Sequence, residues 1–410
     1  MAYNLLLKFL SRIFYMKVLF INTLYYPNIV GGAERSVQFL AEALVHESHN
    51  SVVISTMPGT GVQTGEVNGV KVYYVGLKNF YWPFRDKQNP ALLKPFWHLI
   101  DSYNPFMAKE VDKIIEKERP DVVHTNNLAG FSVTVWPVVK RRGLSLVHTI
   151  RDYYLLCPAS NMFKHNSNCE KQCGICRIYS KPRGYYSNLV NVVVGNSKFI
   201  LEKHILQGLF PSAKQRVVFN AYKSNSVPVI SRKHKPMRFG YIGQLNQAKG
   251  VEFILKAIMN SNIENFTLDV AGRGNPEYEN YLKKQSTSNV CFLGFVQPEN
   301  FFSQIDVLFV PSLWHEPLPR TIFEAYSYGI PVVGSNRGGI PELIEEGRTG
   351  FLFDPDRPEE FLKIIVKLVN NPDLVYNMRE ACLKKAEEFT PERIIKQYLQ
   401  VYFESLEKDC

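Results

Sequence analysis

Long hydrophobic runs and nucleic-acid-binding patterns are absent from this sequence of 410 residues. A stretch of about 18 apolar residues, the length that spans a membrane as a helix, does not occur, so no spanning helix is predicted. Basic residues are not interleaved with aromatic ones as on nucleic-acid-binding surfaces, so nucleic acid is not predicted as a partner. Acidic residues number 38 against 48 basic ones, a formal charge of +10. This excess fits an anionic membrane surface or a phosphorylated substrate.

The first fifteen residues, MAYNLLLKFLSRIFY, contain no acidic residue and are apolar and basic. A signal peptide is disfavoured because no small-residue cleavage site precedes the strand predicted from Met16. Two interpretations remain for this N-terminal extension. Either it forms an amphipathic helix on a membrane surface, or Met16 is the true start of the chain. We expect a cytoplasmic protein, which in the first case associates peripherally with the inner face of the membrane.

Short apolar segments alternate with helical ones throughout the sequence, which indicates parallel α/β sheets. The chain is long enough for two domains, and a polar, basic and proline-containing segment at residues 221–236 divides it. In such sheets, ligands bind beyond the carboxyl ends of the strands. The strands predicted before the division are residues 17–22, 51–55, 71–75, 121–124, 145–150 and 192–195, and those after it are residues 239–242, 267–271, 291–293, 307–310 and 331–333.

An apolar stripe at helical spacing follows the first strand of each half, which fits a helix packed against a sheet. The stripes are Val37, Leu40, Ala41 and Leu44 in the first half and Val251, Ile254, Leu255 and Ile258 in the second. We therefore predict two doubly wound Rossmann-like domains that face each other across a cleft. The predicted divisions are an extension at residues 1–15, a first domain at 16–222, a linker at 223–236, a second domain at 237–389 and a final helix within 390–410.

Two acids, Glu316 and Glu324, are separated by seven residues at a predicted strand-to-helix junction. Residues 307–310 have the pattern of a buried strand, residues 313–319 that of a loop, and a helix is predicted from Arg320. Glu316 in the loop could accept sugar hydroxyls, and Glu324 on the helix could accept ribose hydroxyls. The alternative is that both acids are solvated charges on a helix face.

The start of that helix is a candidate diphosphate site, because its free N–H groups and partial positive charge bind anions. Pro317 and Pro319 lack an N–H group, so the donors would be those of Leu318, Arg320 and Thr321.

The segment at residues 307–354, which also contains a Gly-Gly-Ile-Pro-Glu turn, resembles the donor-site signature of retaining GT-B glycosyltransferases. This large family includes sucrose synthase and bacterial mannosyltransferases. The resemblance covers nearly all of the chain after Met16, because other matching segments follow in the same order. They are MKVLFINTLYYPNIVGGAER (16–35), DVVHT (121–125), VVGNS (193–197), RVVFNAY (216–222) and FGYIGQLNQAKG (239–250).

The resemblance implies a GT-B fold whose second domain binds a nucleotide-diphosphate sugar and whose first domain binds a saccharide or lipid-linked acceptor. A hexosyl group would be transferred with retention of configuration, in surface polysaccharide or glycoconjugate synthesis. The final helix, from about residue 391 to 406, would cross back to the first domain. No catalytic metal is implied, and Asp354-Pro-Asp356, which follows a terminal strand, has the pattern of a structural Asp-Pro turn.

Lys249 is the residue that the resemblance assigns to the donor diphosphate. An Arg shortly after the strand shares this role in the family, but here Gln244, after Gly243, occupies that position. Gln donates hydrogen bonds without a charge, so one cation is missing, and Arg273 or Arg320 could replace it. The alternative for Lys249 is a solvated surface lysine.

Gly31 and Gly32 follow the first strand and precede a helix. Paired glycines let backbone N–H groups approach a ligand closely, although they also suit a simple tight turn. The Ala-Glu-Arg that follows matches the family, which favours a site contacting the donor.

Arg151 and Asp152 occupy a segment that carries a His-Asp pair near the anomeric carbon in the family. Here Arg151 replaces the histidine, a permanent cation in place of a titratable group. It could stabilise the leaving phosphate, bind an acidic acceptor or simply pair with Asp152. His148, nearby, has the pattern of a core strand residue.

Four of the seven cysteines lie within residues 157–176, a predicted insertion in the first domain. Three interpretations remain open: a structural zinc site, disulfides in an oxidising compartment, or reduced thiols that pack a loop. The C-x2-C part suits zinc, whereas the other spacings are not standard for it. The cysteines are Cys157, Cys169, Cys173 and Cys176.

Two other functions remain compatible with the sequence. The fold could serve a nucleotide-sugar epimerase or phosphorylase, although Glu316 and Glu324 fit a transferase better. It could also serve a non-catalytic partner subunit, which Gln244 and Arg151 favour and which Lys249, Glu316 and Glu324 oppose.

Overall fold

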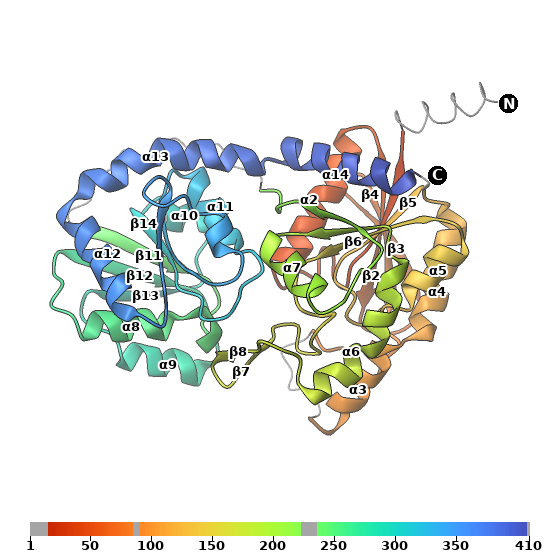
Figure 1. Cartoon of the computed structure of the whole chain (residues 1–410), viewed down its shortest axis with the longest axis horizontal. Helices are drawn as coiled ribbons and strands as arrows, with labels where there is room; N and C mark the ends of the chain where they lie inside the picture. Colours follow the sequence, from red (N-terminus) through yellow and green to blue (C-terminus); the bar gives the residue numbers. More distant parts are fainter. Residues whose placement is uncertain (1–14, 85–90, 223–235, 408–410) are drawn as a thin grey trace. The chain divides into compact units, whose positions relative to one another are not determined.

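The computed structural model describes residues 15–84, 91–222 and 236–407, which form two compact units (Figure 1). Unit 1 contains the described residues of 15–162, 171–221 and 391–407, and unit 2 contains residues 163–170 and the described residues of 222–390. The predicted N-terminal helix and nearly all of the predicted linker lie outside the described residues. None of the helices in the described ranges is long and apolar enough to cross a membrane.

Unit 1 is built on an eight-stranded sheet with the order β10-β9-β6-β5-β1-β2-β4-β3, parallel except for the β3–β4 pair. All six strands predicted for this half are present. The sequence analysis missed β3 and β10, whose residues are mostly exposed and therefore lack an apolar pattern. The strands are β1 (Lys17–Ile21), β2 (Asn50–Met57), β3 (Val62–Val67), β4 (Val70–Gly76), β5 (Val122–Thr125), β6 (Ser145–Ile150), β9 (Val192–Gly195) and β10 (Lys214–Val217).

The helices of unit 1 flank this sheet, and the predicted stripe of the first one is buried: Val37, Leu40, Ala41 and Leu44. These elements are α2 (Gly32–His46), η1 (Ala91–Leu93), α3 (Lys94–Ser102), α4 (Pro105–Glu118), α5 (Val135–Arg141), α6 (Gly174–Tyr186), η2 (Ser187–Leu189), α7 (Lys198–Ile205) and α14 (Pro391–Leu406).

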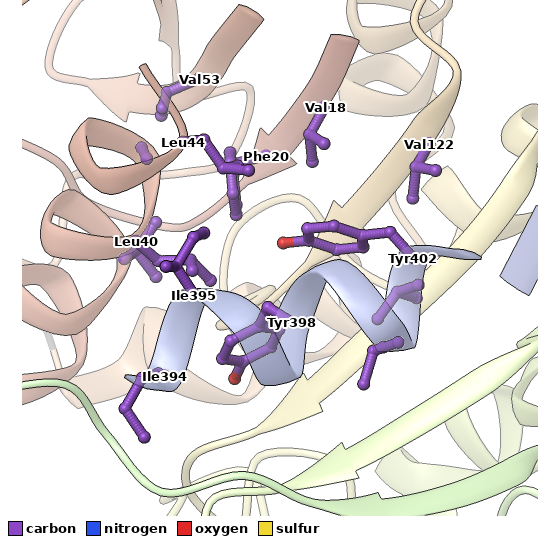
Figure 2. Packing of buried hydrophobic residues seen from close by; sticks show 14 of the residues in the cluster. Val18, Phe20, Leu40, Leu44, Val53, Val122, Ile394, Ile395, Tyr398 and Tyr402 are labelled. Carbon is purple, nitrogen blue, oxygen red and sulfur yellow. The ribbon is translucent and has the colours of Figure 1, made fainter. Parts of the chain in front are cut away.

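The last helix, α14, returns to unit 1 as predicted, and Figure 2 shows its apolar face in the core beside β1 and α2. Ile394, Ile395, Tyr398 and Tyr402 are buried there. The Tyr402 hydroxyl lies 2.9 Å from Nδ1 of His124 on β5, so polar contacts also fix the position of the helix. Full burial lowers the pKa of His124 well below its usual value, which keeps this imidazole neutral.

Unit 2 has a six-stranded, wholly parallel sheet with the order β13-β12-β11-β14-β15-β16. The five strands predicted here are present, and β16 is the terminal strand expected before Asp354. The strands are β11 (Met237–Ile242), β12 (Phe266–Ala271), β13 (Val290–Gly294), β14 (Val307–Val310), β15 (Val332–Ser335) and β16 (Gly350–Phe353).

The helices of unit 2 cover this sheet, and the second predicted stripe is buried as well: Val251, Ile254, Leu255 and Ile258. A small hairpin from the cysteine-rich segment also belongs to unit 2. These elements are η3 (Gln247–Lys249), α8 (Val251–Met259), α9 (Pro276–Lys284), α10 (Pro298–Phe302), α11 (Arg320–Ser327), η4 (Ile340–Glu342), α12 (Pro358–Asn370), α13 (Pro372–Ala386), η5 (Glu387–Phe389) and the hairpin strands β7 (Phe163–Lys164) and β8 (Ser167–Asn168).

Candidate functional site

The loops after β11 and β14 form the centre of the candidate site in unit 2. These strands are neighbours in the sheet, and the direction of the strand order reverses between them, the place where doubly wound sheets bind ligands. The two loops are bonded, since the Leu313 N–H donates to the Ala248 carbonyl at 2.8 Å. Gly250 permits this approach: its φ is +77°, and a Cβ there would lie 1.9 Å from the Pro311 oxygen.

Replacing Gly250 with Ala should therefore lower the free energy of unfolding by at least about 2 kcal/mol, because the new methyl group meets backbone atoms that cannot move away cheaply. Urea unfolding of the whole protein measures this loss. Gly347→Ala is the matched control, since Gly347 has a φ of +72° but an added Cβ finds no atom within 4 Å. Its loss should stay near 1 kcal/mol, roughly the cost of the backbone conformation alone. Equal losses in both variants would contradict a packing role for Gly250.

Lys249 and Glu316 are joined by an ion pair in this site, with 2.5 Å between Nζ and Oε1. The other carboxylate oxygen of Glu316 accepts a hydrogen bond from Ser312 Oγ at 2.6 Å. Glu316 is buried, and its carbonyl accepts a bond of 2.8 Å from the Gly339 N–H in the predicted Gly-Gly-Ile-Pro-Glu turn. The alternative of a solvated helix-face charge is therefore contradicted for Glu316, and the ion pair likewise contradicts the alternative of a solvated surface lysine for Lys249.

The β7–β8 hairpin supports the loop that carries Glu316. Asn168 donates from Nδ2 to the Leu313 carbonyl at 2.8 Å, and its Oδ1 accepts the His315 N–H at 2.7 Å. The sequence analysis did not single out Asn168. A lone amide in a cysteine-rich segment gives no signal of contact with a loop almost 150 residues away.

The helix predicted from Arg320 is α11, and Pro319 precedes it in an extended conformation. Arg320 Nε lies 3.0 Å from Glu324 Oε1, so Glu324 is paired rather than simply solvated. Leu318 is buried and Thr321 is partly buried at the start of the helix. The N-terminal turn of α11 thus combines a cation, backbone N–H groups and a carboxylate one helical turn later.

Gly243 and Gln244, two further candidate donor-binding residues, lie in the loop after β11. The Gly243 N–H bonds to Ala271 on β12 at 3.1 Å, and the Gln244 carbonyl accepts the Tyr241 hydroxyl at 2.8 Å. Arg273, one candidate to replace the missing cation, lies 3.6 Å from Glu279. The other candidate, Arg320, lies at the start of α11.

Unit 1 has its own cluster of polar residues at the carboxyl ends of β1, β5 and β6. Gly31 caps α2, and its N–H donates to Glu34 Oε2 at 2.8 Å, while Gly32 begins the helix. Glu34 is buried, and this burial raises its pKa, against the lowering effects of its hydrogen bonds and of Arg151. The sequence analysis did not select Glu34, although the Ala-Glu-Arg match contains it.

Arg151 is buried beside this turn and donates to two amides. Its Nε bonds to Asn126 Oδ1 at 2.9 Å, and Nη1 bonds to Asn220 Oδ1. Asn126 follows β5 and Asn220 follows β10, so three strand ends meet at the guanidinium. Nearby His148 is a core residue: it is stacked on Phe210, and burial lowers its pKa to about 3.

Asp152 adjoins Arg151, and burial raises its pKa to about 6, although the Tyr154 N–H, bonded at 2.8 Å, and Arg183 act in the opposite direction. A pKa above the unfolded value means that the folded state prefers the protonated acid. The stability that this preference adds to the folded state is fully present below about pH 4 and is lost as the pH rises through 6.

The free energy of unfolding of Asp152→Asn relative to that of wild type should consequently increase as the pH rises from 4 to 7, by up to about 3 kcal/mol. The Asn Oδ1 can still accept the Tyr154 N–H, so the comparison isolates the charge. Urea unfolding at both pH values measures the effect, with Asp356→Asn as the control, because the Asp356 side chain is 82% exposed. A difference from wild type that does not change with pH would contradict the raised pKa.

The cysteines of the predicted zinc site are divided between the two units. Among the described residues, no three His, Cys, Asp or Glu side chains are placed to hold a metal ion. Three thiols are nevertheless neighbours: burial, together with the nearby Cys173 and Cys157 thiols, raises the pKa of Cys176 to about 12. All of the predicted ligands are unbridged thiols, and Cys169 belongs to unit 2.

Comparison with known families covers both units. Residues 223–389 match the model described as "Glycosyl transferases group 1", and residues 30–224 match "Glycosyltransferase Family 4". The chain belongs to the group 1 glycosyltransferases. Within this glycosyltransferase, Lys249, Glu316 and Glu324 fall in the group 1 part, whereas Gly31, Arg151 and Asp152 fall in the family 4 part.

Relatives of this glycosyltransferase match it over nearly its whole length. It is 32% identical to an uncharacterized 42.6 kDa protein in the cps region of Klebsiella pneumoniae, over 94% of this chain and 100% of the relative. The structure of sucrose-phosphate synthase from Thermosynechococcus elongatus is similar with a TM-score of 0.71 and 17% identity, over 95% and 98% of the two chains. Anabaena HepE in complex with UDP has a TM-score of 0.68 and 19% identity, over 94% and 99%. These likenesses confirm the predicted GT-B fold.

Proposed function

We propose that this glycosyltransferase moves a hexosyl group from a nucleotide-diphosphate sugar to a saccharide or lipid-linked acceptor with retention of configuration. The observation that carries the proposal is the partly buried Lys249–Glu316 ion pair at the switch point of unit 2. The pair holds a cation next to a carboxylate that can accept hydrogen bonds from sugar hydroxyls. It lies where doubly wound parallel sheets bind nucleotides. The structure of HepE in complex with UDP supports a nucleotide-sugar donor.

In the proposed reaction, Lys249 and the first N–H groups of α11 stabilise the diphosphate as its bond to the anomeric carbon breaks. Glu316 accepts hydroxyl groups of the transferred sugar, and Glu324, oriented by Arg320, accepts the ribose hydroxyls. No step requires a divalent cation, because the side chains and helix dipole supply the charge. Gln244 adds a neutral hydrogen-bond donor.

In unit 1, we infer that Arg151 and Asp152 act together with the Gly31–Gly32 turn, which we assign to contact with the donor. Arg151 is held rigidly by Asn126 and Asn220, so its charge is fixed in place for a leaving phosphate or an acidic acceptor. The relative in a cps region supports a role in polysaccharide synthesis. We further propose that the enzyme works at the inner face of a membrane, where lipid-linked acceptors are found.

A thermal-shift screen with uridine-, guanosine- and adenosine-diphosphate sugars tests the proposal, because a ligand that binds the folded state raises its melting temperature. One donor class should give a saturable shift, and proton NMR of the product formed from it should show the same anomeric configuration as the donor. The absence of saturable binding to any of the three classes would overturn the transferase proposal in favour of a non-catalytic subunit. An inverted product would overturn retention alone.

A further inference from the structure

Helix α3 and the turn η1 before it carry an exposed apolar stripe. Leu92, Phe96, Leu99 and Tyr103 follow one another at helical spacing, and each is at least half exposed, with Leu92 at 87%. The opposite face of α3 buries Trp97 in the core. A helix that packs one face inward normally presents polar residues outward, whereas this apolar stripe stays largely exposed even though Phe96 contacts the Phe80 ring and Tyr103 the Tyr186 ring.

Helix α6 carries a second stripe of the same kind. Ile175, Ile178 and Tyr185 lie on one side of it, with exposures of 65%, 70% and 71%. Its other side buries Arg183 and Ser180.

The two helices pack against each other in unit 1, so the stripes lie on adjacent elements (Figure 1). The Tyr179 hydroxyl donates to the Pro95 carbonyl at 3.2 Å, and Arg183 pairs with Asp101 at 3.1 Å in full burial. We call the two stripes and the exposed charges between them the α3/α6 surface: Leu92, Lys94, Phe96, Leu99, Tyr103, Ile175, Arg177, Ile178, Lys181 and Tyr185.

The solvent-exposed charges on α3 and α6, both fully described helices, are all positive. Lys94, Arg177 and Lys181 are exposed, whereas the one acid, Asp101, is buried in its pair with Arg183. An apolar surface rimmed by cations matches the chemistry of an anionic lipid bilayer.

A cavity of about 250 Å³ adjoins this surface and shares Tyr103 with it. Lys109 and Arg141 are among its lining residues, and Tyr103 is stacked with Tyr186 at 6.3 Å. One lining acid, Asp112, is paired with Arg142 at 2.5 Å. The cavity thus offers cations and aromatic rings to a phosphate head group beside the apolar stripe.

We propose that the α3/α6 surface docks this protein onto an anionic lipid bilayer, with its apolar side chains among the acyl chains and its cations at the phosphates. A second copy of the chain is a poorer occupant, because a symmetric contact would bring Arg177 and Lys181 against the same cations. This inference rests on the proposed membrane association and not on the donor chemistry.

Sedimentation with vesicles of phosphatidylglycerol and phosphatidylcholine tests the proposal. Phe96→Ser combined with Ile178→Ser should weaken binding at least tenfold. Arg177→Gln combined with Lys181→Gln should weaken it about 25-fold, roughly fivefold for each cation near an anionic surface. The matched control is Leu206→Ser combined with Phe295→Ser, since these side chains are 80% and 71% exposed elsewhere. The control should bind as wild type does, and pure phosphatidylcholine should bind all variants weakly.

Deletion of residues 2–14 tests the α3/α6 surface without the N-terminal extension. The truncated protein should still bind the anionic vesicles, and Phe96→Ser combined with Ile178→Ser should abolish that binding. Wild-type binding by the doubly substituted proteins would overturn the proposal, as would an equal loss in the control. A solution dimer that these substitutions dissociate, without any change in vesicle binding, would assign the surface to a second copy instead. Thermal shifts with the donor should be unchanged in every variant, so failure of docking is distinguishable from failure of the transferase proposal.

Discussion

Lys249→Ala is expected to weaken donor binding roughly 30- to 150-fold, the loss of about 2 to 3 kcal/mol that a charge-assisted hydrogen bond to phosphate contributes in a partly buried site. Lys249 lies in the loop after β11, where the diphosphate would bind. Gln244 is neutral and cannot replace the lost charge. Calorimetric titration with the nucleoside diphosphate and with the whole donor should show the same loss, because Lys249 acts on the phosphates that both ligands share.

The Lys256–Glu252 pair on α8 provides a matched control for this experiment. Its Nζ–Oε1 distance is also 2.5 Å, but it lies on the helix surface, with Lys256 52% exposed. Lys256→Ala should therefore leave the donor affinity unchanged while removing an ion pair of the same length. Equal affinities in wild type and Lys249→Ala would contradict the assigned role, provided that both proteins unfold well above the temperature of the titration.

Glu316→Gln is expected to lower kcat/KM for transfer by about 100-fold or more, while binding of the nucleoside diphosphate alone becomes tighter, by up to about tenfold. The two effects have opposite signs because Glu316 is paired with Lys249 when no donor is bound. The amide frees the ammonium group for the diphosphate, but it no longer presents two acceptor oxygens to the sugar hydroxyls. Ser312 Oγ can still donate to the Gln oxygen, so the local fold should persist.

Steady-state kinetics together with titration of the nucleoside diphosphate measures both effects in one protein. Glu252→Gln is the control, since it breaks the Lys256 pair on α8 and should alter neither value. Weaker binding of the nucleoside diphosphate to Glu316→Gln would contradict the idea that the acid competes for Lys249. Unchanged transfer would remove Glu316 from the set of sugar-binding residues.

The sequence predicted most strands and helices because the central strands and packed helices carry clear apolar periodicity. It missed β3 and β10 because these sheet-edge strands face solvent and lack an apolar pattern. Asn168 was missed for a different reason. Its two hydrogen bonds join a hairpin to a loop almost 150 residues later, and no local pattern encodes that contact.

Motif order and residue type in the sequence were sufficient to identify the family, the GT-B architecture and the chemical character of Lys249, Glu316 and Glu324. The tertiary structure decided which of these groups meet. Parallel strands bring β11 and β14 together, so a lysine and an acid 67 residues apart become one partly buried ion pair. It also placed Arg151 between Asn126 and Asn220, left the cysteines without a metal-binding arrangement in the described residues, and exposed two apolar stripes on α3 and α6. Burial and proximity depend on packing across the whole chain, and a linear pattern of residues does not contain them.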